Sequence, residues 1–152
     1  MMRNIGYRRF LWALSLLGVL IFIFGNSLMP ASVSGAESRS FFDHLSEIFP
    51  FLTHHLVRKL AHFAEYALLG AHLAFIPALF LPLPRLGYPI GLFAGVFVAM
   101  ADEGIQCFVP GRAGLWGDVL LDGLGSVFGF CFMLCAWLIY IKRKERRLEK
   151  QK

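Results

Sequence analysis

The chain has 152 residues, of which 57% are hydrophobic and 16% are charged, with a mean hydropathy of +0.62 and a net charge of +5. This composition is too apolar for a soluble domain of that length and is typical of a membrane protein. Too little sequence lies outside the apolar stretches to bury a second core, so we expect a single domain over residues 1–152.

Four apolar stretches are each close to the ~20 residues that a helix needs to cross a bilayer. They cover residues 10–28, 60–81, 87–107 and 119–141. The sequence therefore predicts an all-α, polytopic membrane protein in which four transmembrane helices form a compact bundle. The small residues ASVSGA after the first stretch would suit cleavage of a secretory signal, but the length of that stretch favours a retained anchor.

Basic residues set the predicted orientation, because Lys and Arg beside a span are retained on the cytoplasmic side. Eleven of the fifteen lie at the N-terminus, between the second and third stretches, or in the tail KRKERRLEKQK. With four spans, both termini are then cytoplasmic and segments 29–59 and 108–118 face outward. Beside a membrane helix, a basic tail is expected to contact anionic lipid heads rather than nucleic acid.

The outer segment SRSFFDHLSEIF, residues 38–49, has apolar side chains at helical spacing, and Ser40 with Asp43 resembles a helix start. It predicts a short amphipathic helix in the membrane interface between the first two spans, where it could cover the ends of the bundle. The adjacent pair His54 and His55 lacks a partnering metal motif, and we interpret it as interfacial polar residues.

The second span begins RKLAHFAEYALLG, in which five polar side chains share about a third of the helix circumference at ~100° per residue. These are Arg58, Lys59, His62, Glu65 and Tyr66. His72 lies deeper on the same side, and we interpret it as a hydrogen-bonded side chain rather than part of a proton path.

The third span ends ADEGIQ and the fourth begins WGDVLLDGLGSVFG, so acidic and small residues share a stripe on each helix. The polar members are Asp102, Glu103, Gln106, Asp118 and Asp122. Glycine at every fourth position lets membrane helices approach closely, so we expect these two spans to pack together with their acids inward. The joining loop adds Arg112 between glycines, which can present its guanidinium to the same pocket.

All these motifs fall at the outer ends of their spans, which predicts one polar pocket at the outer face. Ionisable groups are costly inside a membrane, so a dense cluster indicates a functional site more than mutual neutralisation. A divalent cation is one option, with His62 and the three aspartates as ligands, although no paired metal motif assigns a resident metal. Alternatively His62 and Glu65 act as acid and base, while Arg58, Lys59 and Arg112 hold a phosphate or carboxylate. The candidates for a catalytic role are His62, Glu65, Asp102 and Asp118.

The blocks RKLAHFAEYALLG and ADEGIQCFVPGRAGLWGDVLLDGLGSVFG resemble the signature region, about residues 57–130, of the VanZ-like family of bacterial membrane proteins. The resemblance implies a bacterial cytoplasmic membrane and a set of important positions. These are Lys59, His62, Glu65, Tyr66, Asp102, Glu103, Gln106, Arg112, Asp118 and Asp122. Relatives often carry Asn near position 122, where this chain has Asp and so an added charge.

The name-giving members of that family lower susceptibility to the glycopeptide teicoplanin, so the resemblance implies a related role in the cell envelope. We therefore predict a protein that binds or alters an amphipathic ligand with an anionic head at the outer leaflet, with membrane lipids as partners. The alternative is an intramembrane enzyme acting on a lipid-linked phosphate or glycan head group. The sequence leaves open the ligand, the existence of a reaction and the oligomeric state.

Overall fold

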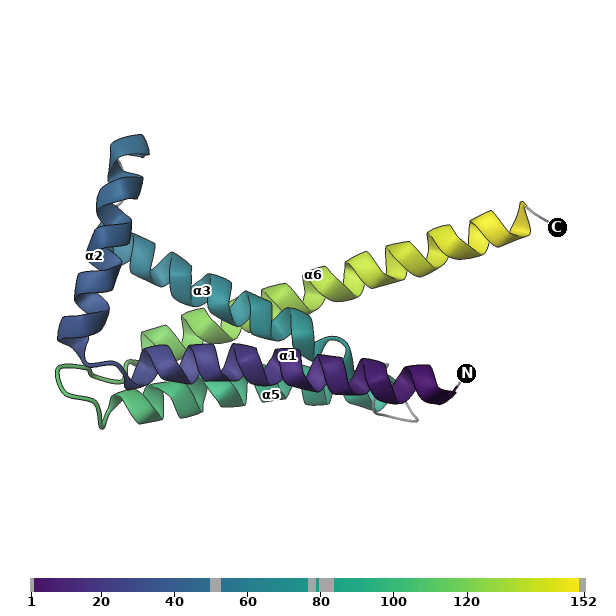
Figure 1. Ribbon diagram of the computed structural model, residues 1–152, viewed down its shortest axis with the longest axis horizontal. Coiled ribbons are helices and arrows are strands. Elements are labelled where there is room, and N and C mark those ends of the chain that lie inside the picture. The colour runs from purple at the N-terminus through teal and green to yellow at the C-terminus, as the bar shows by residue number, and fades with distance from the viewer. Residues whose placement is uncertain (1, 50–52, 77–78, 80–83, 151–152) are drawn as a thin grey trace.

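The computed structural model describes residues 2–49, 53–76, 79 and 84–150 (Figure 1). The helices with described bounds are α1 (Met2–Leu28), α2 (Ala31–Ile48), α3 (His54–Leu73), α5 (Pro84–Gln106) and α6 (Trp116–Glu149). The described part of the chain contains no strand, which confirms the all-α prediction for that part.

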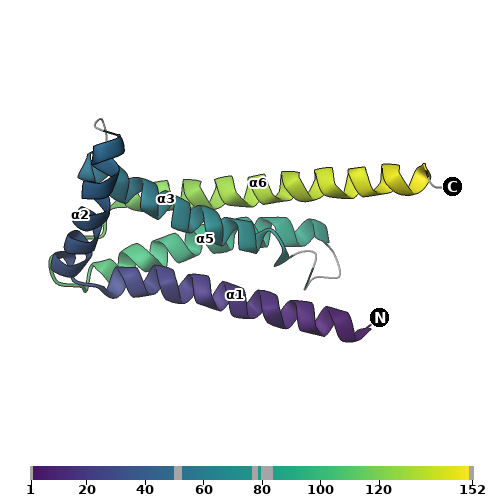
Figure 2. The same cartoon turned by 45° about the horizontal axis from the view of Figure 1, so that its top comes forward.

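Four of these helices, α1, α3, α5 and α6, run lengthwise, and α2 lies across one end of them (Figure 1 and Figure 2). The start of α1 and the end of α6 point to the opposite end (Figure 1). The start of α3, the end of α5 and the start of α6 all lie at the α2 end. The polar motifs predicted to share one depth are therefore at the same end of the molecule.

Among the described residues, three helices are long and apolar enough to cross a membrane, at Ile5–Leu28, Gly87–Gln106 and Trp116–Glu149. These correspond to three of the four predicted spans. Helix α3 has 20 residues but carries three charged side chains in its first twelve, Arg58, Lys59 and Glu65, which lower its hydropathy. Its role as a fourth span therefore stays a prediction.

The bounds of two predicted elements were wrong. Helix α3 ends at Leu73 rather than residue 81, and its last turn closes where the Ala74 N–H donates to the Gly70 carbonyl at 3.0 Å. Pro77 follows three residues later in the sequence, and a proline lacks the N–H that would donate to the Leu73 carbonyl and continue the helix. Helix α2 begins at Ala31, after Pro30, rather than at Ser40, so the amphipathic segment is only its second half.

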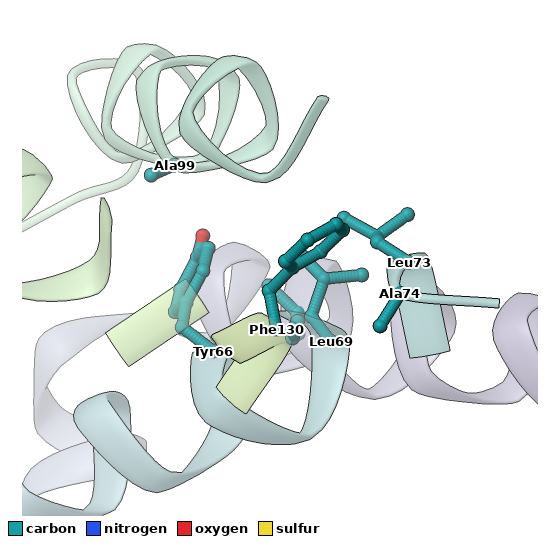
Figure 3. Close-up of a cluster of buried hydrophobic side chains, with 7 residues drawn as sticks. Tyr66, Leu69, Leu73, Ala74, Ala99 and Phe130 are labelled. Carbon is teal, nitrogen blue, oxygen red and sulfur yellow. The ribbon is translucent and has the colours of Figure 1, made fainter. Parts of the chain in front are cut away.

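The buried apolar core lies mainly between α3, α5 and α6. Its members are Ile23, Tyr66, Leu69, Leu73, Ala74, Ala99 and Phe130. Figure 3 shows the Phe130 ring beside Leu69 and Leu73, whereas the Tyr66 hydroxyl points toward Ala99 on α5. On α3, the core residues follow directly after the charged residues of the helix.

Helices α3 and α6 cross with their backbones in contact. A Cβ atom on Gly125 would lie 2.6 Å from the Phe63 carbonyl oxygen, and one on Gly129 would overlap the Ala67 carbonyl. Only glycine permits this approach at both positions, which is how small residues bring membrane helices together. The crossing sets the separation between the polar residues that precede it on each helix.

The expected packing of the third on the fourth span needs a correction in its details. The glycine stripe of α6 faces α3, as the contacts of Gly125 and Gly129 show. Helix α5 does pack on α6, but there its own small residues meet larger side chains: Gly95 meets Ser126, and Gly91 meets the Phe130 ring. A stripe of small residues indicates a face that packs closely, but it does not determine which helix packs against that face.

Candidate functional site

The polar cluster at the α2 end contains most of the buried polar side chains that the structure describes. The described residues of this kind are Ser27, Asp102, Glu103, Gln106, Asp122 and Ser126. They come from α1, α5 and α6, and α3 adds partly buried groups between them. The buried polar residues and the groups from α3 divide into two clusters.

The first cluster, called the α5 cluster here, consists of Asp102, Glu103 and Gln106 with its partners. The Gln106 amide donates to Asp102 Oδ2 at 3.1 Å and to Glu103 Oε1 at 3.2 Å, and it lies 3.4 Å from Ser27 Oγ. Glu103 Oε2 accepts the backbone N–H of Leu115 at 2.9 Å. Both oxygens of Glu103 are thus satisfied, and the cluster joins the ends of α1 and α5 to the start of α6.

The second cluster, called the α3–α6 cluster here, consists of two pairs across the helix crossing. Lys59 Nζ lies 3.6 Å from Asp118 Oδ1, and His62 Nδ1 lies 3.7 Å from Asp122 Oδ2. The two pairs lie one helical turn apart, because residues three or four apart on a helix face the same way. Asp118 is therefore partnered by Lys59, one turn from the His62–Asp122 pair.

Several buried polar atoms in this region lack a hydrogen-bond partner within the described residues. They are His62 Nδ1, the Tyr66 hydroxyl, Asp102 Oδ1 and both carboxylate oxygens of Asp122. An unsatisfied buried group costs about 1–3 kcal/mol, and more when charged. Such a group in a native structure requires an explanation. One ligand atom each from His62, Asp102 and Asp122 lies within 4.8 Å of the other two, so these residues form a candidate metal-binding group.

A cavity of about 250 Å³ opens beside the α3–α6 cluster. It is lined by His55, Arg58, Lys59, His62, Leu115, Asp118, Leu121 and Asp122. Arg58 forms no ion pair among the described residues. The cavity therefore combines an available guanidinium with two buried or partly buried acids, and one of the two interfacial histidines, His55, contributes to its wall.

Two predicted site residues contact α1 instead of the cavity. Glu65 Oε1 accepts from Asn26 Nδ2 at 3.1 Å, and Arg112 Nη2 donates to the Asn26 carbonyl at 2.8 Å. Gly111, with φ of 76°, supplies the left-handed backbone that turns this loop back toward α1. Burial lowers the pKa of Arg112 and nearby Arg58 adds to this, while the surrounding acids oppose the shift.

The sequence analysis missed Asn26 and Ser27, which bring α1 into the site. Both lie at the end of the first apolar stretch, in GNSL, where two adjacent polar residues interrupt an otherwise apolar segment. That interruption was the available signal. The prediction that His72 is hydrogen-bonded is confirmed, because its ring nitrogens lie 2.9 Å from Ser15 Oγ and 2.9 Å from the Leu68 carbonyl.

These features define a helical membrane protein in which ionisable residues from several helices converge at one end of the apolar bundle. A comparison with protein families is consistent with that class, because the VanZ/LLP1 family model matches residues 10–140. The chain therefore belongs to the VanZ/LLP1 family, as the signature blocks predicted. No curated protein and no solved structure gives a significant match.

Proposed function

We propose that the protein crosses a bacterial cytoplasmic membrane four times, through α1, α3, α5 and α6, with both termini in the cytoplasm. The distribution of basic residues supports this orientation, since eleven of fifteen lie at the cytoplasmic ends of the proposed spans. The common direction of the α1 start and the α6 end supports it too (Figure 1). The polar clusters and α2 then lie at the outer face.

The proposed function is to bind the anionic head group of an amphipathic ligand at the outer leaflet and thereby lower susceptibility to teicoplanin-type glycopeptides. The observation that carries this proposal is the 250 Å³ cavity, where Arg58 is available and Lys59 has only one partner. Guanidinium and ammonium groups bind phosphate and carboxylate through charge-assisted hydrogen bonds. Such a cavity would hold the polar part of the ligand.

A second cavity supports the amphipathic character of the ligand. It has a volume of about 230 Å³ and is mostly apolar, with lining residues Met100, Glu103, Gly104, Cys107, Gly114, Leu115, Trp116 and Val119. Leu115 borders both cavities. A ligand with its head in the first cavity could place part of an acyl chain along the second.

The test is the susceptibility of a sensitive Gram-positive host to teicoplanin and vancomycin. The host expresses wild type, Arg58→Gln or Arg143→Gln at matched membrane levels, or carries an empty vector. Arg143→Gln removes the same charge from the exposed tail end of α6. We expect wild type and Arg143→Gln to protect against teicoplanin more than against vancomycin, and Arg58→Gln to lose at least fourfold of that protection, about 0.8 kcal/mol if protection follows ligand occupancy. Equal protection by both variants would contradict a role for the cavity.

The alternative function, an enzyme acting on a lipid-linked phosphate or glycan, is favoured by one observation. His62 and Asp122 lie 3.7 Å apart at the wall of the cavity that contains Arg58, which suits acid–base chemistry on a bound head group. Purified protein incubated with bacterial membrane lipids would then change the mass of a lipid head group. His62→Gln would abolish that change, and an unchanged lipid profile with wild type would contradict the enzyme.

A further inference from the structure

The least explained feature of the site is the group of His62, Asp102 and Asp122. The two aspartates are completely buried, with 0% of each residue exposed. Neither oxygen of Asp122 has a hydrogen-bond partner within the described residues, and Asp102 Oδ1 and His62 Nδ1 have none either. These unpartnered atoms converge, because one atom from each residue lies within 4.8 Å of the other two.

The described residues compensate for this arrangement only in part, through the ion pair of His62 with Asp122. Two buried carboxylates repel each other, and burial of each is costly unless a cation or hydrogen bonds accompany it. Protonated His62 could offset one charge, yet its separation of 3.7 Å from Asp122 is longer than a charge-assisted hydrogen bond. The nearest lysine, Lys59, is paired with Asp118. A cation of charge +2 between the three side chains would balance both carboxylates while the imidazole stays neutral.

We propose that His62, Asp102 and Asp122 bind a divalent cation of the Zn²⁺ or Mn²⁺ type. One imidazole nitrogen with two carboxylate oxygens suits these ions, whereas Mg²⁺ and Ca²⁺ prefer ligand sets made of oxygen alone. Ligand atoms about 2.0–2.2 Å from one ion lie roughly 3–4 Å from each other. Small side-chain rotations from the present spacing would therefore close the site.

The surroundings of the three ligands fit a metal site in two further respects. Gln106 holds Asp102 Oδ2 at 3.1 Å, which orients the carboxylate with its other oxygen available, as outer partners of metal ligands do. His62 and Asp122 line the 250 Å³ cavity, which gives the ion an entry path and leaves a coordination position open to a ligand. The ion would also join α3, α5 and α6.

The experiment is direct measurement of bound metal. Full-length protein with an affinity tag that lacks histidine is purified in detergent, treated with EDTA, incubated with ZnCl₂ or MnCl₂, and desalted before elemental analysis. We expect about one equivalent of one of these metals in wild type. Binding should be weakened at least about tenfold in Asp122→Asn and His62→Gln, because losing a ligand costs no less than losing an outer partner of a ligand. Glu65→Gln removes one negative charge nearby, but Glu65 bonds to Asn26, so this control should retain the metal.

Folding is checked by helical circular dichroism and by the thermal unfolding midpoint in detergent. Metal should raise the midpoint of wild type and Glu65→Gln but not that of Asp122→Asn, since only a species that binds the native state stabilises it. The proposal is overturned if wild type retains neither metal, if Asp122→Asn and His62→Gln retain it, or if Glu65→Gln loses it equally. Metal binding without protection from teicoplanin would leave this site standing and contradict only the proposed function.

Discussion

The two acidic clusters at the α2 end of the molecule differ in how their carboxylates are partnered. In the α5 cluster, Glu103 has both oxygens hydrogen-bonded, and Gln106 joins it to Asp102. In the α3–α6 cluster, Asp122 is equally buried yet neither of its oxygens has a partner within the described residues.

This difference separates two uses of buried charge. A satisfied polar network holds helix ends in one arrangement and contributes to stability. A buried carboxylate without partners reduces stability, and it is retained where the chemistry of a site requires it. Apart from Asp102 Oδ1, which lacks a partner within the described residues and belongs to the proposed metal site, the α5 cluster therefore has the character of a structural junction. The α3–α6 cluster with its cavity has the character of a functional site. Three substitutions test this contrast.

The largest effect is expected from Gly129→Ala, because its methyl group would overlap the Ala67 carbonyl and force α6 away from α3. Overpacking costs typically 1–3 kcal/mol, and a clash with backbone belongs at the upper end, roughly 3 kcal/mol or more. Gly123→Ala is the matched control on the same helix, since its methyl group would meet only Val96 Cγ2 at 3.8 Å. Thermal unfolding in detergent measures both. Similar midpoints for the two variants would mean that the close α3–α6 crossing does not hold the polar residues of the two helices in place.

A smaller effect, roughly 2 kcal/mol, is expected from Gln106→Leu. The substitution preserves most of the side-chain volume but leaves Asp102 Oδ2 and Glu103 Oε1 without their donor. The unfolding midpoint of the metal-free protein should fall. Adding Asp102→Asn to this variant should recover part of the loss, because it removes one of the stranded charges. An unchanged midpoint for Gln106→Leu alone would remove the structural distinction between the clusters.

The sequence predicted which helix ends converge, because basic residues determine orientation and the spacing of polar residues determines a helix face. The patterns on α3, α5 and α6 therefore predicted Lys59, His62, Asp102, Asp118 and Asp122 as neighbours at one depth, and both ion pairs of the structure lie among them.

Which helices and side chains contact one another could not be predicted in the same way. The α6 glycines mark a contact face, but which helix it meets depends on the whole bundle, and the structure places α3 there. Asn26 lies in an apolar part of α1 that has no repeating polar pattern, so its contact with Glu65 emerges only from the packing of α1. Arg112 lies in a loop, where no periodicity constrains its direction, and it bonds to the end of α1.

The smallest effect on stability is expected from Asp122→Asn in metal-free protein, and this variant separates the clusters most sharply. Asn has nearly the same shape as Asp but carries no charge, so it removes an unpartnered buried carboxylate without opening a cavity. In this variant His62 can be neutral, so that no unpaired charge is buried at the pair. We expect the unfolding midpoint in EDTA to stay constant or to rise by the equivalent of about 1 kcal/mol. A fall as large as that of Gln106→Leu would instead identify Asp122 as a structural partner of His62, and the two clusters would then share one role.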